Sequence, residues 1–494
     1  MLQLLLVFVL ITGVTYYLTI RRSRKRLFEL MGTYPGPFDL PLIGSTYIGI
    51  GLNSRTVVEY LLKFLHTLPS PFRAWIGPYA TLLFDQPKHL AVILNSQKLV
   101  QKSFFQKFFR FDKGVINADH VLWRMLRKRL GPPFSKQVVS DFVPTFNEQA
   151  DGQLEYLDRF VGSEAVDMLP KMSVYALSST LVNLFQVKLH AKDYDFCEKF
   201  AENSEKMWIH MFRRVYKPWI IPEFLYRLTP SYKVELQQVA KLRALSKEIV
   251  QAREVLRGKT PPSNNDCTNT EILIDRLERL TYGTGELDYA TMMDNIDTFL
   301  FASVDTTSST VASTLLMMAM HPEVQERVYR EVAQVIPAGD YVALEDLPKL
   351  AYLDQVIKET MRLIPVATIL NRVCTEELQV DDQWTIPMGA IVGIPVIKIH
   401  RDRRIWGERS EEFDPDHFLP ERCAQRHPYA YIPFSAGIRN CIGMRYAMIS
   451  MKVVLVKMVK RFRFRTDLKM SDLKFEAAFL LMLANKHMVQ IERR

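Results

Sequence analysis

Hydrophobic residues recur every three to four positions along most of the chain, which is the spacing of one face of an α-helix. The pattern predicts helices over Val57–Leu68, His120–Leu130, Asn147–Phe160, Val234–Arg257, Asp294–Met320, Pro322–Val335, Leu350–Leu363 and Met444–Phe462. Short runs rich in β-branched and aromatic residues predict fewer strands, at Ala80–Phe84, Arg372–Cys374, Trp384–Ile386, Ala390–Pro395 and within the last twenty residues. We therefore expect a mainly α fold with small β-sheets.

The first twenty residues follow a different pattern. The run from Leu2 to Ile20 contains no charged residue, and as a helix it would span roughly the ~30 Å hydrocarbon thickness of a bilayer. The basic cluster from Arg21 to Arg26 follows this run, whereas a cleavable signal peptide, the alternative, carries its positive charge before the apolar run. Because basic flanks stay cytoplasmic, we expect one transmembrane helix over residues 1–20, with the rest of the chain in the cytosol.

Behind the predicted anchor, residues 21–44 combine the basic cluster with Pro35, Gly36, Pro37, Pro41 and Gly44. The spacing of these prolines and glycines excludes helix from Pro35 to Gly44, and the segment is predicted to be a basic stop-transfer sequence followed by a stiff, proline-rich hinge. The only later linker-like stretch is the short polar segment 258–270, and no repeat marks a boundary. We expect residues 45–494 to form one catalytic domain.

Composition and charge exclude several classes of protein. With 48% hydrophobic and 24% charged residues, the chain is globular rather than disordered. The net charge is +10, and the basic cluster after the apolar run supplies half of it, so the remainder is too mild to indicate nucleic acid binding. Five cysteines without a C-x-x-C pair indicate neither a disulfide framework nor a zinc site.

One cysteine lies in an unusual position. Cys441 belongs to Phe434-Ser-Ala-Gly437-Ile-Arg439-Asn-Cys441-Ile-Gly443, a loop directly before a predicted helix. The positive end of a helix favours thiolate, and therefore a metal ligand or a nucleophile. Gly437 and Gly443 permit close approach of a flat partner, Phe434 can shield the sulfur, and Arg439 can reach a carboxylate. A flat macrocycle with a metal and carboxylates is haem, with Cys441 as the iron ligand.

This F-x-x-G-x-R-x-C-x-G pattern resembles the ligand loop of the cytochrome P-450 haem-thiolate monooxygenases, and the resemblance implies the cytochrome P-450 fold. Glu359 and Arg362 are similar to the E-x-x-R pair of that family, which frames the haem. Taken alone, the pair is typical of a surface ion pair. The family usually completes the triad with an arginine where this chain has His417, so we expect a weaker triad or substitution by Arg422.

Further residues match the propionate-binding positions of the resembled family. Trp123 and Arg127 are similar to its W-x-x-x-R motif, and Arg372 occupies the place of a propionate-binding arginine. Together with Arg439, these residues would complete a cationic pocket for the two haem carboxylates. Without the resemblance, Trp123 would more often be a core or membrane-surface aromatic.

The predicted helix at Asp294–Met320 contains Phe301-Ala-Ser303-Val-Asp305-Thr306-Thr, which is similar to the family's A-G-x-D-T-T. Splitting dioxygen requires protons, so an acid next to an alcohol predicts a relay in which Asp305 supplies Thr306. Such a Thr-rich stretch is otherwise usually a packing feature. Ser303 replaces the usual glycine and should narrow the oxygen groove. Ala302 stands where many fatty-acid hydroxylases of the family carry a haem-esterifying Glu, so noncovalent haem b is expected.

The resemblance implies an activity, partners and a location. The string from Arg426 to Gly437 is most similar to the animal clan that contains fatty-acid omega-hydroxylases. We expect a membrane monooxygenase that oxidises a hydrophobic small molecule with O2, using electrons from NADPH through a separate flavin reductase, with cytochrome b5 as a further candidate partner. The expected location is the endoplasmic reticulum membrane, with the catalytic domain facing the cytosol. Two alternatives stay open: a haem-thiolate isomerase or dehydratase of lipid peroxides, and a noncatalytic haem or lipid binder.

Two surfaces are also predicted. Exposed cations around the cysteine face, among them Arg124, Lys128, Arg129 and Arg439, should help dock an acidic reductase. The segment from Trp208 to Phe224 alternates large aromatics with cations, a composition that suits a second membrane contact. The alternative is that these aromatics pack inside the body.

Overall fold

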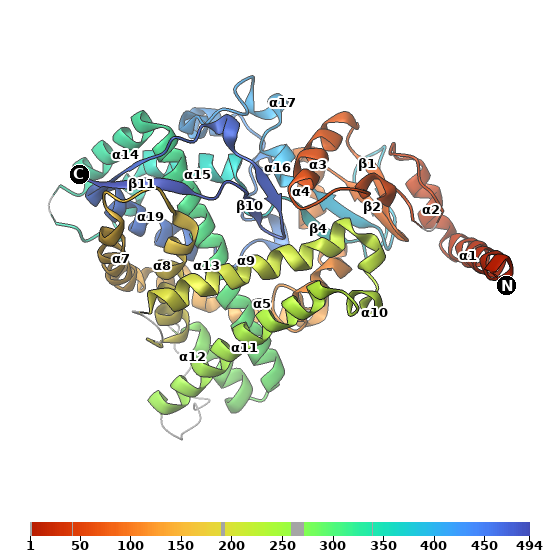
Figure 1. Cartoon of the computed structure of the whole chain (residues 1–494), viewed down its shortest axis with the longest axis horizontal. Coiled ribbons are helices and arrows are strands. Elements are labelled where there is room, and N and C mark those ends of the chain that lie inside the picture. Colours follow the sequence, from red (N-terminus) through yellow and green to blue (C-terminus); the bar gives the residue numbers. More distant parts are fainter. Residues whose placement is uncertain (1, 42, 189–192, 258–270, 338) are drawn as a thin grey trace.

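The computed structural model describes residues 2–41, 43–188, 193–257, 271–337 and 339–494. The predicted linker at 258–270 therefore lies outside the described residues. Within them, helices fill most of the body. The strands labelled β1, β2 and β4 lie toward the end from which α1 and α2 extend, whereas β11 lies near the C-terminus at the other end (Figure 1). The prediction of a mainly α fold with small sheets is confirmed.

Most of the longer helices form the body of the molecule, and α1 and α2 extend from it (Figure 1). The longer helices are α1 (Leu2–Ser23), α2 (Lys25–Gly32), α3 (Thr56–Thr67), α4 (Pro87–Asn95), α5 (His120–Leu130), α7 (Val143–Leu157), α8 (Met168–Phe185), α9 (Tyr194–Tyr216), α11 (Pro230–Arg257), α13 (Tyr289–Met320), α14 (Pro322–Val335), α15 (Ala351–Leu363) and α19 (Met444–Arg461). Shorter helices connect them: α6 (Lys136–Ser140), α10 (Glu223–Tyr226), α12 (Leu273–Glu278), α16 (Val396–Ile399), α17 (Arg403–Trp406) and α18 (Pro420–Ala424).

The strands form four small sheets. The largest has the order β1 (Phe72–Ile76), β2 (Tyr79–Leu83), β7 (Ile391–Ile394), β4 (Leu370–Val373), and its β2–β7 pair is parallel. The others pair β10 (Leu481–Leu483) with β9 (Phe475–Ala477), β11 (Met488–Arg493) with both β3 (Val166–Asp167) and β8 (Phe462–Arg465), and β5 (Leu378–Gln379) with β6 (Thr385–Ile386). In the largest sheet Arg372 pairs with Val392, which fixes it next to the cysteine loop.

The core of the fold is built around α13, a helix about 48 Å long at 1.5 Å per residue. It begins five residues before the predicted start, because the Asp288 carboxylate caps it by accepting the Thr291 N–H. Helix α8 was not predicted. Its residues are buried on nearly every face, so its sequence carries no amphipathic stripe.

The predicted hinge is packed against the body of the protein. Residues from Pro35 onward are extended, yet they pack against β1, where Arg73 donates its N–H to the Pro35 carbonyl at 2.8 Å. Helix α2 buries Leu27 and Met31 in the core around the largest sheet. Among the described residues, no helix has the length and hydrophobicity that crossing a membrane requires. The anchor over residues 1–20 stays a prediction.

Candidate functional site

Cys441 lies in a tight loop before α19. Its N–H donates to the Phe434 carbonyl at 2.9 Å, which closes the loop. Gly437 has φ +68°, and a side chain there would collide with the Leu94 carbonyl, so the close approach made here is to α4 rather than to a flat partner as expected. A Cβ at Gly443 would meet no atom within 4 Å. Gly443 therefore borders open space beside the thiol.

The Cys441 thiol lies deep among protein atoms, and this burial raises its pKa. The N–H groups of Gly443 and Met444 and the guanidinium of Arg127 oppose that rise. The side chain is nevertheless exposed by its accessible surface, so a ligand can reach the sulfur. The expected stabilisation of thiolate by the helix end is present but smaller than the cost of burial. A metal ion at the sulfur would reverse this balance, because metals bind the thiolate.

Three basic side chains gather beside the loop: Lys102, Arg372 and Arg439. Burial lowers the pKa of Arg372 to about 10 and that of Arg439 to about 9. The pKa of Lys102 is also lowered, by burial and by the charges of the two arginines. Among the described residues, no acidic group acts on any of the three. Buried cations without an anion are unfavourable, so this pocket fits an anionic ligand.

The residues matched to propionate binding are held beside this pocket. The guanidinium carbon of Arg439 lies 4.9 Å from the centre of the Trp123 ring, and its Nη1 donates to the Val100 carbonyl at 2.6 Å. Arg127, one turn after Trp123 on α5, donates to the side-chain oxygen of Asn440 at 2.7 Å. Arg439 is only 8% exposed, so it does not belong to the docking surface on which it was also placed.

A buried triad supports the site from α15. Glu359 and Arg362 are joined by hydrogen bonds of 2.6 and 2.7 Å. His417 Nδ1 lies 3.0 Å from the same carboxylate, which also accepts the Asp414 N–H at 2.9 Å. Arg362 donates in addition to the His400 carbonyl at 2.8 Å. The network therefore fixes α15 to the segment that leads toward the cysteine loop.

The substitution by Arg422 that we expected does not occur. Arg422 is half-exposed and lies 3.6 Å from Asp414 instead. His417 itself completes the triad, and Arg426 donates to the His417 carbonyl. The Arg426 guanidinium also lies 4.2 Å from the centre of the Trp406 ring. Arg426 thus supplies a guanidinium beside the triad, although from outside the P-x-R-F position.

Asp305 and Thr306 are neighbours on α13. The Thr306 hydroxyl donates to the Ala302 carbonyl at 2.7 Å, and the Asp305 carboxylate accepts the indole N–H of Trp208 at 2.7 Å. Burial raises the pKa of Asp305 to about 7, although the hydrogen bonds from Trp208 and Ser204 favour its charged form. An acid that titrates near neutral pH can both take up and release a proton.

The side chain of Ser303 is tied to two helices. Its hydroxyl donates to the Phe299 carbonyl at 2.5 Å and accepts from the Thr180 hydroxyl of α8 at 2.9 Å. The serine therefore replaces the family's glycine with a fixed link between α8 and α13.

Aromatic rings form a wall over this part of α13. Trp208 lies 5.1 Å from Phe301 and 5.3 Å from Phe109, and Phe109 lies 4.5 Å from Phe479, all measured between ring centres. Because Phe301 is about one helical turn before Asp305, the wall adjoins the acid. Sequence reasoning placed Trp208 in the membrane-facing segment, which is wrong, since it is 1% exposed. Its partner lies 97 residues away, so no local pattern indicated this role.

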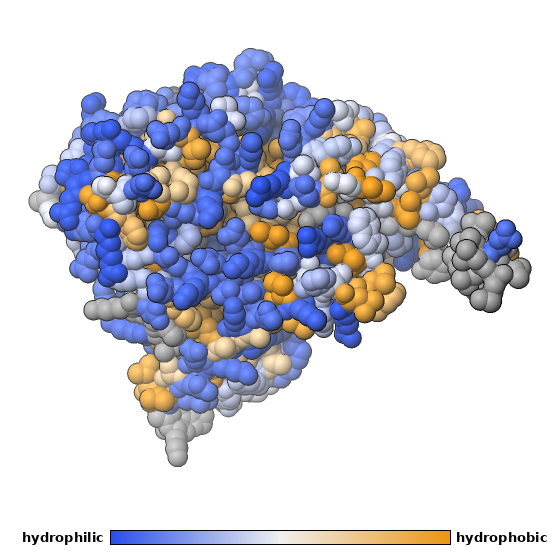
Figure 2. Space-filling view, viewed as in Figure 1, coloured by the Kyte–Doolittle hydropathy of each residue, from blue (hydrophilic) through white to orange (hydrophobic). Residues whose placement is uncertain are grey.

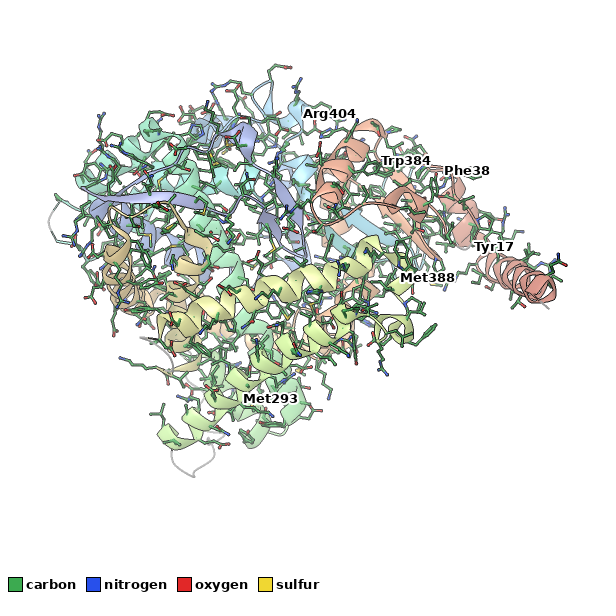
Figure 3. All side chains as sticks on the ribbon, viewed as in Figure 1. Tyr17, Phe38, Met293, Trp384, Met388 and Arg404 are labelled. Carbon is green, nitrogen blue, oxygen red and sulfur yellow. The ribbon has the colours of Figure 1, made fainter. Side chains whose placement is uncertain are left out.

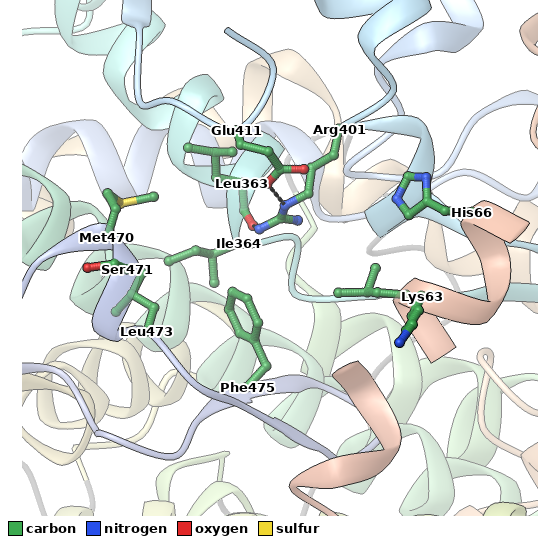
Figure 4. Close-up of a pocket in the computed structure, with 11 residues that line it drawn as sticks. Lys63, His66, Leu363, Ile364, Arg401, Glu411, Met470, Ser471, Leu473 and Phe475 are labelled. Carbon is green, nitrogen blue, oxygen red and sulfur yellow. Dashed lines mark hydrogen bonds and ion pairs between the residues drawn. The ribbon is translucent and has the colours of Figure 1, made fainter. Parts of the chain in front are cut away.

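A separate cavity of about 490 Å³ lies between α3, the end of α15 and the residues before β9 (Figure 4). Arg401 reaches into it and donates to Glu411 at 3.0 Å. Neither Cys441 nor Asp305 lines this cavity, so it is not part of the candidate site.

The residues present fit haem. The side chain of Cys441 is accessible, and a group of cations without acidic partners lies beside it. Cys441 would bind the iron, while Lys102, Arg372 and Arg439 would meet the carboxylates. Lys102 was not predicted, because it belongs to none of the motifs that mark the site.

Comparison with known proteins agrees with this site. The family model described as Cytochrome P450 matches residues 35–491. The chain is 30% identical over 486 residues to "Probable cytochrome P450 313a5" of Drosophila melanogaster, with 96% of each chain covered. It is 29% identical over 466 residues to "Cytochrome P450 4c21" of Blattella germanica, covering 92% of this chain and 91% of the relative. The chain therefore belongs to the cytochrome P450 family and is a haem-thiolate monooxygenase.

Proposed function

We propose that this enzyme inserts one oxygen atom of O2 into a hydrophobic substrate, such as a fatty acid, a steroid-like molecule or a xenobiotic, and reduces the other atom to water. Bound haem supplies the activation of oxygen. The observation that carries the proposal is the buried acid Asp305 beside the alcohol Thr306, under an aromatic wall. This pair favours a monooxygenase over a lipid-peroxide isomerase, whose chemistry needs no proton relay.

Each of the two residues has a distinct task in the relay. Asp305 takes up a proton at its carboxylate and passes it toward the Thr306 hydroxyl, which is oriented by its bond to the Ala302 carbonyl. The aromatic wall excludes bulk water, so protons reach the site through these groups. Because bulk water is excluded, the release of hydrogen peroxide is limited.

An apolar cavity supports a hydrophobic substrate. It measures about 290 Å³, and its lining includes Ile48, Trp75, Phe105, Phe212, Ile369 and Phe479. Phe479 also belongs to the aromatic wall, so the cavity ends at the wall over α13. A passage of this kind admits apolar molecules and offers few partners to charged ones.

We place the enzyme at a membrane, single-pass over residues 1–20, in the endoplasmic reticulum with its body in the cytosol. Exposed hydrophobic side chains gather near α1 and around α10 (Figure 2), among them Trp219, Phe224 and Leu228, which are 53%, 69% and 81% exposed. Phe38 and Met388, also exposed, lie toward the same end (Figure 3). Arg214 does not contribute as predicted, because it is buried and paired with Glu223 at 3.1 Å.

Membrane contact can be measured with liposome flotation. A chain lacking residues 2–23 should still float with phospholipid vesicles, and Trp219→Glu with Phe224→Glu should abolish this binding. Val255→Glu is the matched control, since Val255 is 82% exposed but lies at the far end of α11. Flotation unaffected by the double change would refute the contact.

Electrons are proposed to come from NADPH through a separate flavin reductase, with cytochrome b5 as a further donor, because the chain has no glycine-rich dinucleotide motif. Arg124 and Lys128 of α5 are exposed near the cysteine face and form the proposed docking surface. Arg129 is paired with Glu286 at 2.7 Å and is less available. Lys128→Glu should slow reduction at low ionic strength and have little effect at high salt.

The proposed reaction is tested by turnover with reductase and NADPH, compared with added peroxide alone. Thr306→Ala should keep haem but divert NADPH electrons into hydrogen peroxide. Thr310→Ala is the matched control, because Thr310 makes the same kind of bond one turn later, to the Thr306 carbonyl at 2.8 Å. Equal peroxide yields from both variants, or turnover of a lipid peroxide without NADPH, would contradict the monooxygenase proposal.

A further inference from the structure

A small cavity connects Asp305 with the protein surface between α8, α9 and α13. Its volume is about 30 Å³, enough for a water molecule by the usual requirement of ~10–15 Å³. Polar groups line it: Ser173, Glu202, Glu205, Asp305, Ser309 and His487. Glu202 is exposed, whereas Asp305 is buried, so the cavity leads from solvent to the acid. We propose that this cavity is the route by which protons reach Asp305, with Glu205 as the carboxylate that passes them on.

Glu205 has the properties that such a role requires. It is half-buried, and among the described residues it forms no hydrogen bond or ion pair, so its carboxylate is free to exchange a proton. Burial raises its pKa, with Asp167, Glu476 and Glu202 adding to the rise and Lys486 opposing it. Its charge acts on Asp305 as well.

The one histidine that lines the cavity does not compete for the proton. His487 Nε2 lies 3.0 Å from the Ser313 hydroxyl, and burial lowers the pKa of the imidazole to about 4. It stays neutral at neutral pH. Besides the exposed Glu202, the cavity therefore offers two acids below the surface that can carry protons to α13, the half-buried Glu205 and the buried Asp305.

The proposed proton transfer from solvent to Thr306 conserves atoms and charge at each step. A hydronium ion from solvent protonates the Glu205 carboxylate and leaves as water, and the Glu205 O–H bond then breaks as a cavity water accepts the proton. That water gives up one of its protons to Asp305, whose new O–H bond breaks when the proton moves on toward Thr306. One positive charge moves inward, both carboxylates are regenerated, and no electron is transferred. Trp208 donates to Oδ2 of Asp305 and Ser204 also donates to the carboxylate, but two oxygens with two lone pairs each leave room to accept the proton.

Trp208 separates the proposed proton route from the apolar side of α13. Its indole N–H holds Asp305, while its ring packs between Phe109 and Phe301 in the aromatic wall. The wall separates the apolar side of α13 from the cavity. Protons and substrate thus approach the helix from different directions.

The test uses the full-length haem protein and compares Glu205→Gln, Glu205→Asp and the control Glu254→Gln, since Glu254 is an exposed glutamate of α11 that does not line the cavity. Infrared difference spectra detect the carboxyl band of protonated Asp305, assigned by its loss in Asp305→Asn. After mixing with D2O, Glu205→Gln should slow the exchange of this band about tenfold. Glu205→Asp should restore most of the rate, and Glu254→Gln should change nothing. With reductase and NADPH, Glu205→Gln should also enlarge the solvent isotope effect on NADPH consumption.

A second variant tests the cavity rather than the acid. Ala201 lines it, so Ala201→Leu should displace the water and slow exchange at Asp305 while Glu205 remains in place. Normal exchange in both Glu205→Gln and Ala201→Leu would overturn the proposal. Because the infrared measurement needs neither substrate nor turnover, its outcome does not depend on the substrate proposed above.

Discussion

Replacing Asp305 with asparagine should stabilise the protein at alkaline pH, although the change damages a residue of the proposed relay. The carboxylate is buried with hydrogen bonds from Trp208 and Ser204, and burial is the largest influence on it. Asparagine keeps nearly the same shape and still offers an oxygen to the Trp208 N–H. It removes the charge and replaces one carboxylate oxygen with an amide NH2 group.

The magnitude follows from the pKa of Asp305, which is raised from 3.8 to about 7 in the folded protein. Between these values the native state keeps a proton that the unfolded state has lost, so the free energy of unfolding falls as pH rises through this window. Three pKa units at about 1.4 kcal/mol each correspond to a penalty of about 4 kcal/mol at pH 8. At pH 5 the penalty is below about 2 kcal/mol, because only part of the window has been crossed.

Urea unfolding at pH 5 and pH 8 measures the effect, with Asp288→Asn as the control. The Asp288 carboxylate is exposed and bonded to Lys113 and Thr291, and these bonds lower its pKa to about 2. It stabilises the fold above its unfolded pKa and loses this contribution as pH falls through the folded value, so Asp288→Asn should destabilise at pH 8. An Asp305→Asn gain that is equal at both pH values, or a loss at pH 8, would refute the reasoning.

Three other changes test the site. Cys441→Ser should abolish the red-shifted Soret band of the reduced, carbon monoxide-bound protein, whereas Cys423→Ser should keep it; the reverse result would reassign the ligand. Glu359→Gln should lower the free energy of unfolding by about 3–5 kcal/mol, because it leaves Arg362 buried without its anion, and a thermal shift near zero would contradict this. Lys102→Met should stabilise the apoprotein while speeding haem loss to apomyoglobin, and haem retention equal to wild type would exclude contact with a carboxylate.

The sequence predicted most of the amphipathic helices, because their apolar stripes are local patterns. Helix α8 was not predicted because it is apolar on every side. The start of α13 was not predicted because a single carboxylate, that of Asp288, extends the helix. The motifs of the candidate site could be located for the same local reason. The roles of Lys102 and Trp208 could not be predicted, because they depend on partners that only the fold brings close.

The contacts of α9 link the two approaches to α13. Phe212 lines the apolar cavity and lies 5.6 Å from Phe479, while Trp208, one turn earlier, holds Asp305 at 2.7 Å. Because both side chains belong to one rigid helix, a movement of α9 that widens the cavity for a substrate must also alter the bond to Asp305. Loss of that bond removes an interaction that favours the charged carboxylate, and so raises the proton affinity of Asp305. A substrate that displaces α9 therefore prepares the acid for proton uptake.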